Sequence, residues 1–471
     1  MKIIRPIDIN TSGTFTRAST GTYFDKDGVL QVAGFNVPRI HYDPVTNEML
    51  GVLVEATSTN YAQAPSLTYA NGEVKQVSEV YGAVAGTYTL SFYGVGTITL
   101  SGVATGTAVG TGANVRTTLT FTKTTGDVTM TVSVGSVEYV QVEPGSVATS
   151  YIYLDSNSAI RTRAADIVTG TGYIYSNLSE AEYPEWESTA SYTANNGVVQ
   201  GSRVMRVLTH KIYENFIAGI NATAPEDDTT GRWLEVGPTN RWGAFDSSLS
   251  TTTSNANTIT YIIKPGRVNG LALLGMNASF VEVAMTANGE TVYSGSADLL
   301  NGNVIGDWYE YFYEPIYQQD ALVITDLIDA ALLNLPAYGD GLISISIEYP
   351  SNTPSVGAIV VGLTADIGLT NYDASVGIVD YSKVDTDQFG KTTVVKRGFS
   401  KRGSFELTVK NEAVDNVVRL LSNYRATPIV WVGTENIYNS LVVYGFYKDW
   451  EVTFTEPKVS RCNLQVEGLP Q

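Results

Sequence analysis

The chain has 471 residues, of which 43% are hydrophobic and only 16% are charged, with 44 glycines and 29 tyrosines. This length predicts three or four folding units of roughly 100–200 residues each, and the composition favours short strands and turns over a helical enzyme or a disordered chain. The formal net charge of −18 disfavours nucleic acid as a partner, because phosphates repel an acidic surface.

The residue types that metal and redox sites need are scarce. Cys462 is the single cysteine, which excludes an intrachain disulfide framework and a cysteine-cluster metal site, and His41 and His210 are the only histidines. The start of the chain lacks a signal-peptide core, and nowhere do about 18 apolar residues follow one another. We therefore expect no cofactor, no metal, no membrane insertion and synthesis in a cytoplasm.

Residues 1–170 are predicted to form a β-sandwich. Residues 87–93, 97–101, 117–122 and 127–134 alternate between apolar and polar side chains, as half-buried antiparallel strands do, and glycines separate them. Short strands at this spacing are typical of a sandwich or jelly roll.

Both ends of this unit carry recognisable motifs. They are FTRASTGTYFD at 15–25, VPRIHYDP at 37–44, GVLVE at 51–55, QVEPGSVATSYI at 141–152 and TRAAD at 162–166. The set resembles a module that is widespread in tailed-bacteriophage virion proteins. The resemblance implies a lectin-type sandwich within a tail fibre or another virion protein.

Residues 171–250 form a predicted small aromatic-rich module. The order Trp186, Tyr192, Tyr213, Pro225, Trp233 is similar to chitin-binding-like carbohydrate modules of phage tails and chitinases. Exposed aromatic rings stack on the apolar face of sugars. Tyr213, Trp233 and Trp242 are therefore the candidate glycan-binding residues, and the competing interpretation is that they fill a small core.

Residues 251–365 are predicted to form a second β-sandwich, with strands at 258–263, 279–285, 342–349 and 356–361 and a short helical turn at 326–333.

Residues 366–471 are predicted to form a small α+β unit. It carries 12 basic and 13 acidic side chains, so that nearly all of the net negative charge lies in the rest of the chain. The pattern predicts an amphipathic helix at 411–425 with Asn411 as its N-cap, flanked by strands at 428–432, 441–446 and 460–467.

A basic cluster stands out in this unit. It has two explanations, a solvated hairpin face or a docking surface for an acidic neighbour, and we expect the second, within a homotrimer. Its members are Lys391, Lys396, Arg397, Lys401 and Arg402.

The motif Asp25-Lys26-Asp27-Gly28 contains part of a calcium-loop pattern, but the remaining acidic ligands of such a loop are absent. A tight turn between two strands is the expected structure.

Together these observations predict an all-β, multi-domain protein with a small α+β C-terminal unit. The function that they favour is a non-enzymatic structural component of a phage tail, a fibre, collar or tail-attached protein, whose partners are other virion subunits, further copies of itself and host surface glycan. No nucleophile-elbow, zinc-protease or Ser-x-x-Lys motif is present. The alternatives are a polysaccharide-degrading tailspike, which needs only two facing carboxylates, and a purely architectural subunit that binds no sugar.

Overall fold

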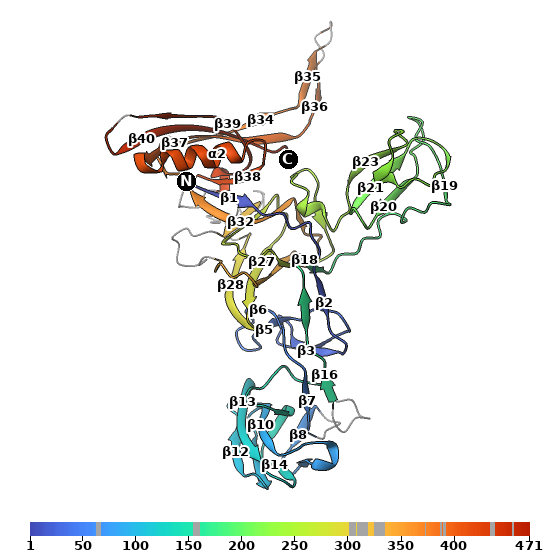
Figure 1. Cartoon of the computed structure of the whole chain (residues 1–471), viewed down its shortest axis with the longest axis vertical. Helices are drawn as coiled ribbons and strands as arrows, with labels where there is room; N and C mark the ends of the chain where they lie inside the picture. The colour runs from blue at the N-terminus through green and yellow to red at the C-terminus, as the bar shows by residue number, and fades with distance from the viewer. Residues whose placement is uncertain are drawn as a thin grey trace.

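The computed structural model describes residues 1–62, 67–153, 161–300, 308, 319–324, 335–372, 374–386, 389, 392–433, 439–454 and 456–471. β-Strands dominate these residues, and the C-terminal unit carries the α-helix α2 (Val414–Asn423). The predicted all-β, multi-domain class with a small α+β unit is confirmed. Figure 1 shows a sandwich at one end, a narrow neck, a central body with a lobe on its side, and the C-terminal unit at the other end. Within the described residues, no helix is both long and apolar enough to cross a membrane.

The terminal sandwich consists of two four-stranded antiparallel sheets. Residues at alternate positions, among them Leu90, Phe92, Ile98 and Val132, are buried in one core between the sheets, as the period-two pattern predicts. One sheet has the order β13 (Gly112–Lys123), β10 (Gly86–Gly94), β15 (Ser136–Pro144), β8 (Thr68–Ala70). The other has the order β12 (Gly106–Val109), β11 (Thr97–Gly102), β14 (Val128–Val134), β9 (Val74–Val77).

The neck, residues 11–60 and 161–169, joins this sandwich to the body (Figure 1). Its described residues form four two-stranded ladders. Two of them pair a segment that precedes the sandwich in the sequence with one that follows it, and the other two are local hairpins. Their strands are β2 (Thr14–Thr16) with β17 (Ile167–Thr169), β3 (Gly21–Phe24) with β4 (Leu30–Ala33), β5 (Ile40–Tyr42) with β6 (Met49–Val52), and β7 (Ser58–Asn60) with β16 (Arg161–Arg163).

The central body is a second sandwich. Ile259 and Tyr261 from a five-stranded sheet share one core with Leu271, Leu273 and Val361 from a ten-stranded sheet. The five-stranded sheet has the order β18 (Gly172–Ser176), β25 (Thr258–Lys264), β30 (Leu342–Glu348), β27 (Phe280–Ala287), β28 (Glu290–Asp298).

The ten-stranded sheet continues from the central body into the C-terminal unit. Its order is β29 (Ala321–Ile324), β26 (Gly270–Leu274), β32 (Ala358–Asp366), β1 (Lys2–Pro6), β38 (Ile429–Val432), β39 (Val442–Thr453), β40 (Val459–Gly468), β37 (Phe399–Lys410), β33 (Leu369–Thr370), and β34 (Ser375–Asp380) also pairs with β37. The first strand of the chain, β1, is hydrogen-bonded between β32 and β38. The predicted boundary between 365 and 366 therefore runs through one continuous sheet, and the first residues of the predicted unit 1–170 lie in that sheet as well.

Helix α2 covers one face of the C-terminal part of this sheet. Val414, Val417 and Leu421 are buried in a core shared with strands β37 to β40, which confirms the predicted amphipathic helix. The predicted N-cap is wrong: Asn411 begins a 3₁₀ turn, Asn411–Ala413, and its side-chain amide bonds instead to Glu456 O and the Ser460 hydroxyl. The predicted helical turn at 326–333 lies outside the described residues.

The lobe on the side of the body holds the aromatic-rich module. A small core of Tyr192, Val204, Tyr213 and Trp233 stabilises it. Its strands are β20 (Arg203–Arg206), β21 (Lys211–Asn215) and β23 (Trp233–Pro238) in one sheet, and β19 (Ser191–Tyr192) with β22 (Gly219–Ile220) in another.

Candidate functional site

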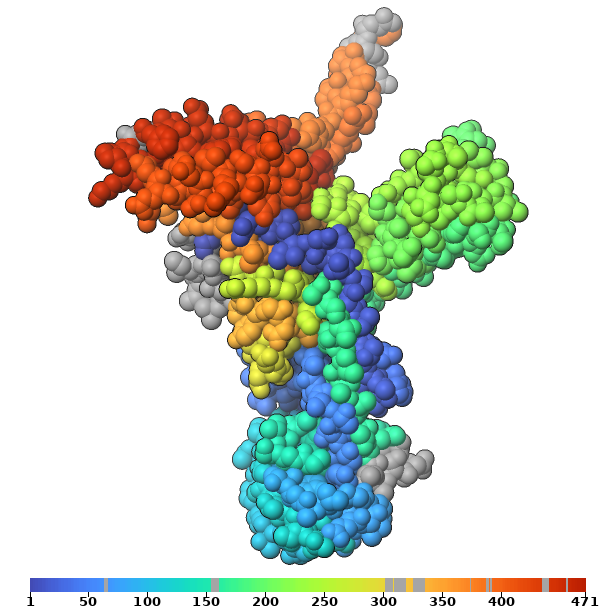
Figure 2. Space-filling model, viewed as in Figure 1, coloured from blue at the N-terminus to red at the C-terminus, as the bar shows by residue number. Residues whose placement is uncertain are grey.

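The C-terminal unit carries a hairpin that stands away from the rest of the molecule. Strands β35 (Lys383–Thr386) and β36 (Thr392–Val395) pair with each other in a two-stranded sheet, and all eight residues of the two strands are exposed. Figures 1 and 2 show this hairpin, hereafter the arm, projecting beyond the surface of the unit.

The two faces of the arm differ in chemistry. The register places Val384 directly opposite Val394, and Thr386 opposite Thr392, so that these four β-branched residues share one uncharged face. The other face carries Lys383 and Asp385, whose side chains form an ion pair at 3.3 Å. The arm is therefore amphipathic, although neither face is covered within the described chain.

Such a hairpin is poorly stabilised by itself. An isolated two-stranded hairpin is marginal in water, and Val384 and Val394 remain 64% and 63% exposed. Open strand edges also invite pairing with another chain. A partner that covers the valine face would bury these side chains and stabilise the hairpin.

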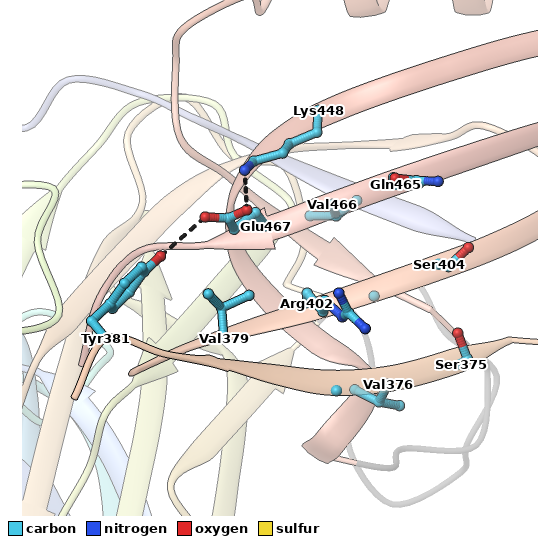
Figure 3. Close-up of a pocket in the computed structure, with 12 residues that line it drawn as sticks. Ser375, Val376, Val379, Tyr381, Arg402, Ser404, Lys448, Gln465, Val466 and Glu467 are labelled. Carbon is cyan, nitrogen blue, oxygen red and sulfur yellow. Dashed lines mark hydrogen bonds and ion pairs between the residues drawn. The ribbon is translucent and has the colours of Figure 1, made fainter. Parts of the chain in front are cut away.

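A groove of about 720 Å³ lies at the base of the arm, between β34, β37, β39 and β40. Figure 3 shows Tyr381, Glu467 and Lys448 at one end of it, Ser375, Ser404 and Gln465 at the other, and Arg402 between them. Most of these residues belong to the face of the sheet opposite α2, because alternate residues of β37 and β40 point away from the helix.

The charges at one end of the groove compensate each other. Lys448 forms an ion pair with Glu467, and Tyr381 Oη donates to Glu467 Oε1 at 3.0 Å. The Lys448 hydrogen bond, then the Tyr381 hydroxyl and the charge of Arg402, lower the pKa of Glu467 against the opposing effect of burial. Arg402 lies opposite Glu467 on the neighbouring strand, and its side chain makes no hydrogen bond to another described residue. The groove is thus a polar surface with one available guanidinium.

The predicted basic cluster is divided by the fold. Lys401 points toward the body, where its Nζ lies 3.1 Å from Asp320 Oδ2, whereas Arg402 lines the groove. Lys396 and Arg397 are exposed at the base of the arm, and Lys391 lies outside the described residues. The docking role of the cluster stays a prediction, with Lys396, Arg397 and Arg402 placed to serve it.

The predicted glycan-binding aromatics are all buried. Tyr213, Trp233 and Trp242 are only 5%, 6% and 4% exposed. Trp233 packs edge-on against Tyr192 at 5.0 Å, and Trp242 stacks on His210 at 4.1 Å where the lobe joins the body. This burial argues against stacking on sugar and favours the competing interpretation, in which the rings fill cores.

The segment 25–28 is the expected tight turn between β3 and β4. Gly28 N donates to Asp25 O at 3.0 Å, and the Asp25 carboxylate accepts hydrogen bonds from the backbone N–H groups of Asp27 and Val29. In the described residues, no group of three or more His, Cys, Asp or Glu side chains is arranged to hold a metal ion.

The valine face of the arm was not predicted from the sequence. The signal was available, because an alternating segment with two β-branched residues, 383–386, and a β-branched run, 392–395, flank a segment that contains Gly390. The sequence analysis assigned docking to the basic cluster that begins at Lys391 and not to these β-branched residues.

Comparisons with known proteins add little to this geometry. No family model matches the chain, and no curated protein matches it. Among solved structures, a fucolectin from the serum of striped bass (Morone saxatilis) aligns at 9% identity over 76% of this chain and 98% of the fucolectin, with a TM-score of 0.13. Superposition at that level carries no information about fold or ligand.

Proposed function

We propose that this chain is a non-enzymatic structural subunit of a bacteriophage tail, and that copies of it associate through their arms as a homotrimer. The motifs at 15–25, 37–44 and 162–166 support the tail assignment, since they resemble a virion module. The single structural observation behind the assembly is the exposed, uncharged valine face of the arm.

Other copies of the same chain are the partner that this face fits best. An uncharged face of Val384, Val394, Thr386 and Thr392 is complementary to itself, because β-branched side chains pack against each other without leaving a charge buried. The opposite face, with the Lys383–Asp385 pair, would remain in water when three arms meet around an axis. Symmetric contacts of this kind are the usual basis of homo-oligomers.

The test is the molar mass of the full-length chain in solution, measured by light scattering during size-exclusion chromatography. The variant Val384→Glu/Val394→Glu places charges on the valine face. The matched control, Lys383→Asp/Asp385→Lys, exchanges the two charges on the other face and retains the ion pair. Each substitution lies on an exposed strand, so none removes a core contact.

We expect the unaltered chain and the control to have three times the mass of one chain, and the glutamate variant to have the mass of one. A single-chain mass for the unaltered protein at high micromolar concentration would contradict assembly through the arm. So would an oligomer that the two glutamates leave intact.

A further inference from the structure

A cavity of about 380 Å³ lies in the neck, next to the terminal sandwich. Three segments that are far apart in the sequence line it, residues 18–21 with Phe35, residues 152–153, and residues 161–163. All but Phe35 and Tyr153 fall within or beside the motifs that resemble the virion module. The proposed assembly does not use this cavity, because the central body separates the neck from the arm (Figure 1).

Buried Arg17 holds the first wall of the cavity in place. Its Nε donates to Ser19 O at 2.9 Å, and its Nη2 donates to Gly34 O at 2.7 Å. The carboxylate of Asp166 neutralises the guanidinium at 3.1 Å, with both side chains fully buried. One arginine therefore fixes both the 18–20 loop and the turn that contains Phe35.

That turn presents an aromatic ring to solvent. Asn36 adopts a left-handed conformation with φ 58°, and its side-chain oxygen accepts a hydrogen bond from Arg17 N at 3.0 Å. The preceding Phe35 is 63% exposed, although it lies in a loop held by several hydrogen bonds. A ring that is held in place in this way can meet a ligand without first ordering its loop.

Arg163, also buried, holds the remaining walls. Its Nη1 donates to the Ser150 hydroxyl at 3.0 Å, two residues before Ile152, and the next backbone N–H, that of Ala164, donates to the Ser19 hydroxyl at 3.0 Å. Tyr153, 39% exposed, is the second aromatic side chain at the cavity. The three walls are thus connected to one another before any ligand arrives.

We infer that this cavity binds a saccharide. Phe35 and Tyr153 supply apolar ring faces for the C–H face of a sugar, while Thr20 and Thr162 place hydroxyl groups around the same space. The volume falls within the range of roughly 300–1,000 Å³ found for small-ligand sites. Preorganised walls also spare the ordering cost that weakens flexible sites. This site is distinct from Tyr213, Trp233 and Trp242, and it would supply the glycan contact of a tail protein.

Saturation-transfer difference NMR tests the inference. The probes are the methyl glycosides of glucose, galactose, mannose, N-acetylglucosamine and fucose, each added to the full-length chain at millimolar concentration. The variants are Phe35→Ala and Tyr153→Ala. The matched control is Phe454→Ala, which removes another exposed phenylalanine, 69% exposed, in the C-terminal unit.

We expect saturation of the ring protons of at least one glycoside, and a loss of affinity of about tenfold in each cavity variant but not in the control. Unchanged near-ultraviolet circular dichroism would verify that the variants are folded. If no glycoside is saturated, or if both cavity variants bind like the unaltered chain, the inference is wrong. The variant Val384→Glu/Val394→Glu should still bind the glycoside, because the cavity is far from the arm. Sugar binding and assembly are therefore tested independently of each other.

Discussion

Arg39 and Asp166, 127 positions apart in the sequence, form a completely buried ion pair in the neck, with Arg39 Nη2 2.5 Å from Asp166 Oδ2. The other oxygen of Asp166 accepts from Arg17, and Arg39 also contacts Glu55 at 2.8 Å. Burial alone would raise the pKa of Glu55, but Arg39, Arg163 and hydrogen bonds from Ser150 outweigh it and lower that pKa to about 2. The motifs at 15–25 and 162–166 thus meet in one charge network that closes the neck.

Removing the shared acid should loosen the neck. Asp166→Asn leaves Arg17 buried without its carboxylate and Arg39 with Glu55 alone, which costs roughly 3–5 kcal/mol. Because a chain of several units does not unfold in one step, hydrogen exchange of the segments 14–24 and 161–169 is the suitable measurement. In Asp166→Asn we expect the protection of these two segments from hydrogen exchange to fall, while the protection of α2 is unchanged. The exposed Asp27→Asn is the control, and equal protection in both variants would contradict the network's role.

A second prediction concerns pH. Burial, and then the neighbouring Glu348 carboxylate, raise the pKa of Glu282 to about 7. The groups that face this pair from the neck are Tyr42, whose hydroxyl donates to Glu282 at 3.2 Å, and Lys26, whose Nζ lies 2.5 Å from Glu348. The folded-state pKa exceeds the ordinary value of 4.5, so that the ionised form of Glu282 is disfavoured by folding.

The contact between the neck and the five-stranded sheet should therefore be fully stable below pH 4.5 and weaken as the pH rises through 7. The expected total change is on the order of 3 kcal/mol. Hydrogen exchange of 40–52 from pH 5 to 8, corrected for the intrinsic rate, measures it. Glu282→Gln should remove most of this dependence, and an equal dependence in the variant would assign it to another group.

The valine face of the arm can be tested by crosslinking. Cys462 is buried, and its burial raises its thiol pKa to about 11, so the unaltered chain provides an unreactive background. Oxidation of Val384→Cys should join two chains in a disulfide-linked species on a non-reducing gel. Lys383→Cys, one residue away on the opposite face, should remain single-chain. Equal crosslinking of the two would mean that the valine face does not point toward the symmetry axis.

A further prediction distinguishes a packing role of Trp233 in the lobe from a role in sugar binding. Trp233→Ala removes the ring that packs against Tyr192 in a core of few residues, and should destabilise the lobe by about 3–5 kcal/mol. We expect protection of 203–215 from hydrogen exchange to be lost, while saturation of the bound glycoside persists. If Trp233→Ala abolishes sugar binding while the lobe stays folded, Trp233 is a glycan-binding residue after all.

Much of the fold could be predicted from local patterns. Alternation at 87–93 and 128–134 identifies strands because one face of each is buried in the terminal sandwich. The apolar spacing of Val414, Val417 and Leu421 identifies α2 for the same reason. The cap at Asn411 could not be foreseen, because its side chain bonds to Ser460, which is distant in the sequence and adjacent only after β40 has paired.

Other features depend on contacts that local patterns do not encode. The position of β1 between β32 and β38 is a pairing across more than 350 residues. Arg17, Arg39 and Arg163 would be expected at the surface as charged residues, yet Asp166 and Glu55 allow their burial. Aromatic residues favour both cores and sugar sites, so that composition alone could not assign Trp233 and Trp242 to cores or Phe35 to a cavity.

Electron cryomicroscopy of intact particles of a tailed phage whose genome encodes this chain tests the central proposal most directly. We expect density for the chain in the tail, with the arms of three copies meeting at Val384 and Val394 around an axis, and the terminal sandwiches at the periphery. Particles that lack the chain, or a map in which each arm ends in solvent without touching another copy, would contradict it.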